Sequence, residues 1–487
     1  MKVQQYKTSN LFFIATGIIL AFFIYYLNPF HLELIASKAV AAAILMIFWW
    51  ISEALPMPVV ALTPVVLHPM LGLSTIEETT KAYSNPVIFL FMGGFMLGLA
   101  IEKWNVHKRI ALNILHRTGA GGNKIILGFI IATAFLSMWL SNTATTMMMF
   151  PIAASVIAVV RDHSTLTKGY RNFALSLMLV IAYASNIGGM ATLIGTPPNV
   201  AFAAFIEKKY GYNIQFVDWL QLCLPMVVFL LFALYFVLTK LLFKNDITHS
   251  EAAQIYINKE LQALGPMSNA EKKVLTIFIL TALLWILKDV LITILPFKLD
   301  DNMIAIFGAI ALFAMPVNKH ENGQKTQLLN WSDTSKMAWG ILLLFGGGIA
   351  LASSLEHSGV MEKLGHSLSA YTNQPTWLLI CIVVTLSIFL SEVMSNVAQV
   401  IILAPVLAAL ADNMGADPLL LGIPMTLAAS AASMLPMGTP PNSIVFGSGH
   451  ISLRQMLKAG FVLNLICVLL ITLFGSFVLP HIMQVLK

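Results

Sequence analysis

Long apolar segments recur along the whole chain and constrain its fold more than any other feature. The segment from Leu11 to Leu27, for example, contains no charged residue. Because a transmembrane helix needs about 20 mostly apolar residues, 487 residues that are 58% hydrophobic can supply about ten or more such helices. Only 10% of the residues are charged, against roughly 25% in an ordinary soluble domain. A soluble globular protein is therefore excluded, and an all-α polytopic membrane protein is predicted.

Other classes of protein are excluded by pattern. The spans of a membrane β-barrel alternate apolar and polar residues over about 10 positions, whereas the apolar runs here are continuous. The net charge is +6, but Lys and Arg lie in short clusters between apolar runs, as topology signals do, so no nucleic-acid partner is expected. Cys223, Cys381 and Cys467 lie in apolar runs without CxxC spacing, which predicts neither disulfides nor a metal cluster.

Apolar windows bounded by charged or turn residues predict about eleven transmembrane helices. These windows lie near 11–28, 39–53, 56–72, 86–118, 173–206, 217–243, 273–297, 303–316, 338–365, 418–450 and 457–484. The first window lacks a signal-peptide cleavage site and is expected to be retained. Two longer apolar segments, about 124–160 and about 377–411, contain a polar break and are predicted to be helical hairpins.

The chain is predicted to consist of two repeated halves, 1–243 and 273–487, joined by a polar cytoplasmic linker or surface helix at 244–272. An offset of 254 residues pairs Phe91 with Phe345, Gly93 with Gly347, Ser137 with Ser391, Ser141 with Ser395 and Asn142 with Asn396. The sequence GlyThrProProAsn occurs at Gly195 to Asn199 and again at Gly438 to Asn442. Each half thus contains one hairpin and one broken helix, at about 173–206 and about 418–450.

The positive charges predict the orientation of the halves. Lys2, Lys7 and the lysines of the linker favour a cytoplasmic N-terminus and linker. If each half crosses the membrane an odd number of times, the second half is inverted. An inverted repeat supports alternating access around a site near the membrane midplane.

The two hairpin breaks are rich in hydroxyl and amide side chains. The first extends from Ser137 to Thr146, and its counterpart extends from Ser391 to Val397. Non-helical backbone at membrane depth persists only where protein or a water-filled cavity surrounds it. A Ser-Asn turn caps the next helix, whose free amides favour an anion. The alternative is that these hydroxyls only cap helices or bond back onto them, and the duplication weighs against it.

The GlyThrProProAsn segments form the second pair of breaks. Consecutive prolines remove amide donors and disfavour helix in the residue before them, so the chain should unwind near Gly195 and Gly438. Unwound carbonyls, together with Ser and Asn oxygens, suit a small alkali cation. A single motif of this kind could be only a kink, but two kinks and two polar tips favour a pair of cation sites. Since no Arg, Lys or His lies in the four breaks, a bound anion should depend on co-bound cations.

These motifs, with the stretch from Trp49 to Pro56, resemble the divalent anion/sodium symporter family over nearly the whole chain. That family includes bacterial dicarboxylate and animal citrate transporters. The resemblance implies eleven transmembrane helices and two re-entrant hairpins, a homodimer in the lipid bilayer of the bacterial inner membrane, and elevator movement of a transport domain against a scaffold domain.

The resemblance also implies the site residues. The first sodium site would comprise Ser137, Ser141, Asn142 and Gly195, and the second Ser391, the carbonyl of Met394, Asn396 and Gly438. The dicarboxylate would contact Asn142, Thr143, Asn396 and Val397, with Thr196, Pro197, Thr439 and Pro440 lining the pocket.

Two positions depart from the family pattern. The second tip has Val397 where many bacterial members have Thr, so this position cannot donate a hydroxyl to the substrate and the choice between dicarboxylate and citrate stays open. Ser391 stands where close relatives have Thr, a change that retains the hydroxyl. We expect the second cation site to survive it.

The function predicted is sodium-coupled import of dicarboxylates such as succinate, malate or fumarate, or of citrate, with at least two sodium ions. A sodium-independent dicarboxylate exchanger and a sulfate transporter of the same fold are the alternatives.

An enzyme is not expected, because neither tip offers a His or Lys to activate Ser141 or Ser395. A channel is disfavoured because the sequence offers no ring of pore-lining charges. Glu53, Glu102, Glu356 and Glu392 lie in or beside apolar runs and are candidates for a function. A structural role is predicted for the repeat mates Glu102 and Glu356, and structural pairing is favoured for Glu392, which could alternatively tune the second cation site or carry a proton.

Overall fold

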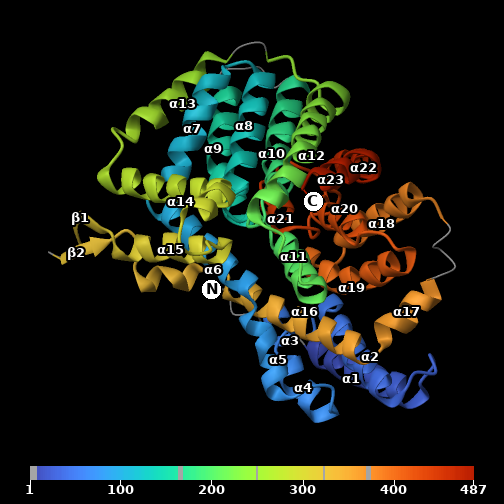
Figure 1. Ribbon diagram of the computed structural model, residues 1–487. Helices are drawn as coiled ribbons and strands as arrows, with labels where there is room; N and C mark the ends of the chain where they lie inside the picture. Colours follow the sequence, from blue (N-terminus) through green and yellow to red (C-terminus); the bar gives the residue numbers. More distant parts are fainter. Residues whose placement is uncertain (1–7, 163–167, 248–249, 322–323, 369–373, 487) are drawn as a thin grey trace. The chain divides into compact units, whose positions relative to one another are not determined.

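The computed structural model describes residues 8–162, 168–247, 250–321, 324–368 and 374–486, which are mostly helical (Figure 1). Within these ranges, ten helical segments are long and apolar enough to cross a membrane, and five further apolar helices are shorter. The chain is thus an all-α, multi-pass membrane protein. The described strands, β1 (Pro316–Glu321) and β2 (Gln324–Gln327), form an antiparallel hairpin that pairs Pro316 with Gln327. This pair of strands was not predicted, because its residues show no apolar alternation.

The helices pack as two compact units, each of which combines segments from both halves of the sequence. The described residues of the first unit come from Met1–Ile88, Val200–Ile214 and Ala338–Ala429, and those of the second from Phe89–Asn199, Gln215–Met337 and Ser430–Lys487. Helices α6 (Pro86–Lys103) and α11 (Pro197–Tyr210) begin in one unit and continue in the other. The division into two repeat halves rests on the sequence alone and remains a prediction.

The first unit is built around α16, which packs against α2, α3, η1 and α19. Its helices are α1 (Thr8–Leu27), α2 (Leu34–Ile51), α3 (Met57–Val60), α4 (Thr63–Leu71), α5 (Ile76–Lys81), η1 (Ala82–Ser84), α16 (Trp339–His357), α17 (Val360–Leu368), α18 (Thr376–Ser391), α19 (Asn396–Met414) and α20 (Leu419–Ala429). A Cβ atom on Gly347 would lie 2.3 Å from the Ala61 carbonyl oxygen. Glycine at this position therefore permits the close approach of α16 to the chain after α3.

The second unit is built around α10, which is buried over nearly its whole length and packs against α8, α9, α12 and α21. Its helices are α7 (Val106–Thr118), α8 (Gly122–Ser137), α9 (Asn142–Asp162), α10 (Lys168–Gly189), α12 (Phe216–Phe236), η2 (Val237–Leu242), α13 (Glu251–Ala263), α14 (Asn269–Ile294), α15 (Asp301–Ala314), η3 (Trp331–Lys336), α21 (Pro440–Phe446), α22 (Leu453–Leu473), η5 (Phe474–Val478) and α23 (Leu479–Leu486). A Cβ atom on Gly188 would lie 2.4 Å from the Ala134 carbonyl oxygen, so α8 and α10 are in close backbone contact.

The predicted continuous spans at 86–118 and 338–365 were wrong, because each is two helices separated by a sharp turn. In the first, α6 ends at Lys103 and α7 begins at Val106; Asn105 between them has φ +56°. In the second, Gly359 has φ +75° between α16 and α17. Asn and Gly tolerate this left-handed conformation, which ends a helix. The two turns lie at matched positions of the sequence repeat, 254 residues apart.

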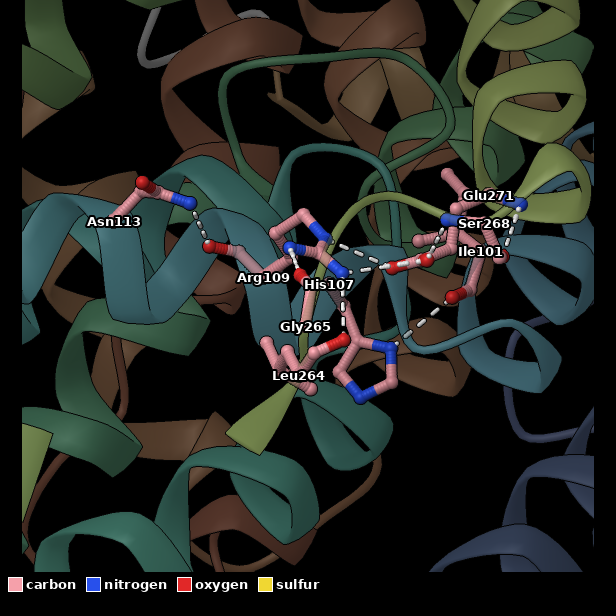
Figure 2. A network of polar contacts seen from close by, with 8 residues as sticks. All are labelled: Ile101, His107, Arg109, Asn113, Leu264, Gly265, Ser268 and Glu271. Atoms are coloured by element: carbon pink, nitrogen blue, oxygen red, sulfur yellow. Dashed lines mark hydrogen bonds and ion pairs between the residues drawn. The ribbon is translucent and has the colours of Figure 1, made fainter. Parts of the chain in front are cut away.

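The polar segment 244–272 contains α13, which packs against α7 and α9. Figure 2 shows how the loop after α13 is held: the Arg109 guanidinium on α7 donates to the Leu264 and Gly265 carbonyl oxygens and to the Glu271 carboxylate. The Arg109 Nε to Glu271 Oε1 distance is 2.9 Å. Ser268 and Glu271 also form a capping box at the start of α14. The chain between α13 and α14 is therefore fixed onto α7.

Candidate functional site

The first hairpin tip consists of the four residues 138–141, between the end of α8 at Ser137 and the start of α9 at Asn142. The Ser141 hydroxyl accepts a hydrogen bond from the Ala144 amide at 3.2 Å, as an N-cap residue does. Thr143 follows in the first turn of α9 and is half-buried. Ser141, Asn142 and Thr143 therefore lie together at the N-terminus of α9.

Ser137 lies in a cluster of oxygen atoms in which the hydrogen-bond acceptors outnumber the hydroxyl protons available to them. Its fully buried hydroxyl is 2.8 Å from Asn142 Oδ1 and 2.7 Å from the Ser185 carbonyl oxygen, and both of these atoms are acceptors. Because a hydroxyl has one proton, it can satisfy one of them at a time. The three oxygens have the character of a site for a hard cation.

Gly195 joins this cluster through the first broken helix. Helix α10 ends at Gly189, and α11 begins at Pro197. A Cβ atom on Gly189 would lie 2.3 Å from Asn142 Oδ1 and 3.2 Å from the Gly195 carbonyl oxygen, so both oxygens border the same point. The structure therefore brings Ser137, Asn142 and Gly195 together, with Ser141 at the same tip.

Asn199, the last residue of the first GlyThrProProAsn segment, holds the loop between α10 and α11. Its fully buried side chain donates to the Thr192 carbonyl oxygen at 2.9 Å and to the Gly189 carbonyl oxygen at 3.2 Å. The Thr192 hydroxyl in turn donates to the Met138 carbonyl oxygen, which ties the loop to the hairpin tip. Thr196 is buried in this loop, and Pro197 starts α11.

Asn442 holds the loop of the second broken helix in the same way. Helix α20 ends at Ala429 and α21 begins at Pro440. The Asn442 side chain donates to the Leu435 carbonyl oxygen at 3.1 Å and to the Ala432 carbonyl oxygen at 3.4 Å. These acceptors match Thr192 and Gly189 at the 243-residue offset of the motif. The roles of Asn199 and Asn442 were not predicted, although the repetition of all five motif residues was a signal for them.

The second loop lies in the second unit, as the first hairpin does. The Asn186 amide on α10 donates to the Thr439 hydroxyl at 3.0 Å, and the Tyr183 hydroxyl donates to the Ser433 carbonyl oxygen at 2.7 Å. Helix α21 packs against α9 and α10. Gly438, Thr439 and Pro440, which belong to the second half of the sequence, are therefore held on helices of the first half.

The second hairpin tip lies in the first unit, between the end of α18 at Ser391 and the start of α19 at Asn396. Ser395 caps α19 by accepting from the Ala398 amide at 3.5 Å. Met394 lies in the turn, and Val397 is buried in the first turn of α19. Of the four residues predicted for the second sodium site, the structure places Ser391, Met394 and Asn396 at this tip, while Gly438 belongs to the second unit.

Ser391 is fully buried and has the surroundings of Ser137, but with a different amide. Its hydroxyl is 2.7 Å from the Ala429 carbonyl oxygen and 2.9 Å from Gln399 Oε1. Among the described residues, Asn396 Oδ1 has no hydrogen-bond partner. Gln399 was not predicted, because it lies beyond the Ser-Asn motif.

Comparison with known proteins shows the family of the chain. The model of the family described as "Sodium:sulfate symporter transmembrane region" matches residues 7–484. A protein of Staphylococcus aureus strain USA300, named "Sodium-dependent dicarboxylate transporter SdcS", is 40% identical over 442 residues, which cover 90% of this chain and 85% of that protein. The protein of the same name from strain MRSA252 is 38% identical over 492 residues, covering 99% of this chain and 94% of its own length.

Proposed function

Because the chain belongs to the sodium:sulfate symporter family and is thus a multi-pass membrane transporter, we propose that it imports dicarboxylates together with sodium ions. The names of its Staphylococcus aureus relatives support this sodium coupling and substrate class. The observation that carries the proposal is the oxygen cluster at Ser137, where one hydroxyl proton faces two acceptors. A sodium ion would compensate the excess of lone pairs there without any charged side chain.

Each hairpin tip would hold one sodium ion. The first would be bound by Ser137, Ser141, Asn142 and Gly195, and the second by residues drawn from Ser391, Met394, Asn396 and Gly438. These ligands are neutral oxygens, so each bound ion leaves its site with a net positive charge. That charge offsets the desolvation of a doubly charged anion, which explains why uptake should require sodium.

The residues proposed to contact the dicarboxylate lie at the N-termini of two helices. Asn142 and Thr143 begin α9, and Asn396 and Val397 begin α19. Free amides and the positive end of the helix dipole favour carboxylate oxygens at both places. Thr196, Pro197, Thr439 and Pro440 are proposed to line the pocket. The Val397 side chain contributes an apolar contact and no hydrogen bond, so it selects for the shape of the acid.

The transport cycle follows from this coupling. Sodium ions bind first and order the tips, the dicarboxylate binds next, and the empty or fully loaded transport domain crosses the membrane in an elevator movement within a homodimer. A half-loaded domain carries an uncompensated charge, and its crossing is blocked by the cost of burying that charge.

Uptake into proteoliposomes tests the proposal. Labelled succinate should accumulate under an inward sodium gradient and should not accumulate when choline or potassium replaces sodium. Unlabelled succinate, malate, fumarate, citrate and sulfate, added one at a time, identify the preferred anion. Equal succinate uptake in all three cations would contradict sodium coupling, and uptake of labelled sulfate that unlabelled succinate does not reduce would assign the protein to sulfate transport. Counterflow without any cation gradient would instead identify an exchanger.

A further inference from the structure

The Thr439 hydroxyl of the second broken-helix loop accepts two hydrogen bonds. The backbone N–H of Asn442 donates to Thr439 Oγ1 at 3.3 Å, as in a helix N-cap. The side-chain amide of Asn186, on α10, donates to the same oxygen at 3.0 Å. A hydroxyl has two acceptor lone pairs and one proton. Both lone pairs of Thr439 are thus occupied, and the hydroxyl can form a further hydrogen bond only as a donor.

The proton of this hydroxyl has no acceptor within the part of the chain that the structure describes. Thr439 is only 4% exposed. The Asn442 side-chain oxygen does not serve as the acceptor, because it has no hydrogen-bond partner among the described residues. A buried donor without an acceptor is costly, so native proteins rarely leave one unpaired. The Thr439 proton is therefore available to a ligand.

The two donors also fix the direction of that proton. Around a tetrahedral hydroxyl oxygen, the O–H bond takes the position that the carbon atom and the two accepted hydrogen bonds leave free. Asn186 is 2% exposed on α10, the most deeply buried helix of the second unit, so its amide has little freedom to move. Without Asn186, one lone pair would be released and the Thr439 hydroxyl could rotate.

The first loop lacks this arrangement. Its counterpart of Thr439 is Thr196, and there the Asn199 N–H donates to the Thr196 carbonyl oxygen at 3.2 Å. Among the described residues, no pair of donors occupies the Thr196 hydroxyl. The two pocket threonines therefore differ: the Thr439 hydroxyl is held as a donor, while the Thr196 hydroxyl is free to reorient.

We propose that Asn186 is a positioning residue for the substrate, because it holds the Thr439 hydroxyl as a donor to a carboxylate oxygen of the dicarboxylate. The inference rests on the proposed function and specifies how one side of its pocket recognises the anion. An ionised carboxylate can only accept hydrogen bonds, so a hydroxyl that can only donate is matched to it. A residue of the first half of the sequence thereby orients a substrate contact of the second half.

A double-mutant cycle tests whether Asn186 acts through Thr439. Asn186→Leu has a similar volume but no donor, and it should raise the KM for succinate about fivefold; Thr439→Val removes the hydroxyl and should raise it about tenfold. If the two residues act as one unit, the double variant should also be raised about tenfold, whereas independent effects would multiply to about fiftyfold. Initial rates of uptake at saturating sodium give these values. A multiplied effect would overturn the proposal.

Tyr183→Phe is the matched control for a purely structural role. Tyr183 lies one turn before Asn186 on α10 and holds the same loop, but through the Ser433 carbonyl oxygen. Its loss should lower Tm and leave the KM for succinate within about twofold of wild type. If it raises KM as much as Asn186→Leu does, the stability of the loop controls affinity, and the proposal is wrong. Thr439→Ser keeps the hydroxyl and should recover most of the affinity that Thr439→Val loses.

Sodium binding without succinate separates this inference from the proposed function. The gain in Tm of the purified protein when sodium chloride replaces choline chloride should be the same in Asn186→Leu as in wild type, and a smaller gain would place Asn186 at a cation site instead. Asn186→Ala takes the place of the Leu variant if that variant does not fold. An unchanged succinate KM in the folded Asn186 variant overturns the inference and leaves the proposed function intact. Wild-type protein without sodium-driven succinate uptake overturns the proposed function itself.

Discussion

The two hairpin tips are built alike in their backbone and differently in their side chains. Each joins two helices through four residues, and each buries a serine hydroxyl between two acceptor oxygens. In the first tip the side-chain acceptor is Asn142; in the second it is Gln399, one helical turn deeper. A duplicated motif can therefore preserve a cluster of oxygen atoms although a different side chain supplies one of those oxygens.

The two broken-helix loops differ much less. Asn199 and Asn442 donate to carbonyl oxygens at matched positions, and the corresponding distances agree within 0.2 Å: 2.9 against 3.1 Å and 3.2 against 3.4 Å. These asparagines hold backbone, whose geometry is common to both repeats. The residues at the tips are proposed to bind ligands, and there the two repeats differ in the side chain that accepts from the buried serine.

The largest effect that tests this comparison is expected from alanine at the two tip asparagines. Asn142→Ala removes an oxygen from the Ser137 cluster and a contact to the substrate, so kcat/KM for succinate should fall about 100-fold, which corresponds to roughly 2.8 kcal/mol. Asn396→Ala removes a buried acceptor oxygen from the second tip and a contact to the substrate, so the KM for succinate and the half-maximal sodium concentration should both rise about tenfold. Initial rates of uptake, measured against both sodium and succinate, separate these outcomes.

The contrast between the two variants is the critical result. If Asn396→Ala leaves the half-maximal sodium concentration unchanged while Asn142→Ala raises it, the Asn396 side chain does not bind the second cation, and the two tips bind sodium differently. If neither variant changes uptake, the cation and substrate sites do not lie at the hairpin tips.

Much of the fold was predictable from local chemistry. Continuous apolar runs predict transmembrane helices, and the paired prolines after Gly195 and Gly438 predict where helices α10 and α20 cannot continue into α11 and α21. The turns at Asn105 and Gly359 were missed because each predicted window ran through the charged residues that flank the turn, such as Glu102 and Glu356. A single left-handed residue also leaves little trace in hydropathy. The strands β1 and β2 were missed because they are polar, and hydropathy detects only apolar elements.

The candidate site was predictable only where it repeats. Ser137 and Asn142 recur as Ser391 and Asn396, and that recurrence drew attention to them. Gln399 has no counterpart amide in the first half, so it carried no such signal. Its importance depends on the rotation of α19 and on the position of the Ala429 carbonyl oxygen, which are properties of packing between helices that lie apart in the sequence.

A smaller effect is expected from Gly189→Ala. The added Cβ atom would lie 2.3 Å from Asn142 Oδ1 and 3.2 Å from the Gly195 carbonyl oxygen, so the Asn142 side chain must move away from Ser137. Overpacking of this size costs about 1–3 kcal/mol, and we expect the half-maximal sodium concentration to rise about tenfold. The second loop has Ala432 at the matched position, so the requirement for glycine should be specific to the first tip.

Gly94→Ala is the control for this prediction. Its Cβ atom would make only ordinary contacts, 3.4 Å from the Ile194 side chain beside the same loop. Sodium dependence should stay at the wild-type level. An unchanged sodium response in Gly189→Ala would mean that Asn142 can serve the cation from another position.

The smallest effect concerns the turns between α6 and α7 and between α16 and α17, and it is seen in the pH dependence of stability. His107 shares a hydrogen bond of 3.1 Å with the Ile101 carbonyl oxygen (Figure 2), whereas its repeat counterpart is Met361. Burial lowers the pKa of His107 below 6.5, although the Ile101 hydrogen bond and Glu102 oppose the shift and Lys108 adds to it. The unfolded chain therefore takes up a proton as the pH falls below about 6.5, before the folded protein does, so folding stability decreases toward acid.

His107→Met copies the second repeat and should remove this contribution. Between pH 7.5 and 5.5 we expect wild type to lose about 1–2 °C more in Tm than the variant does, the scale of an interaction below 1 kcal/mol. Equal losses would show that the first turn, like the second, is held without help from a titrating side chain.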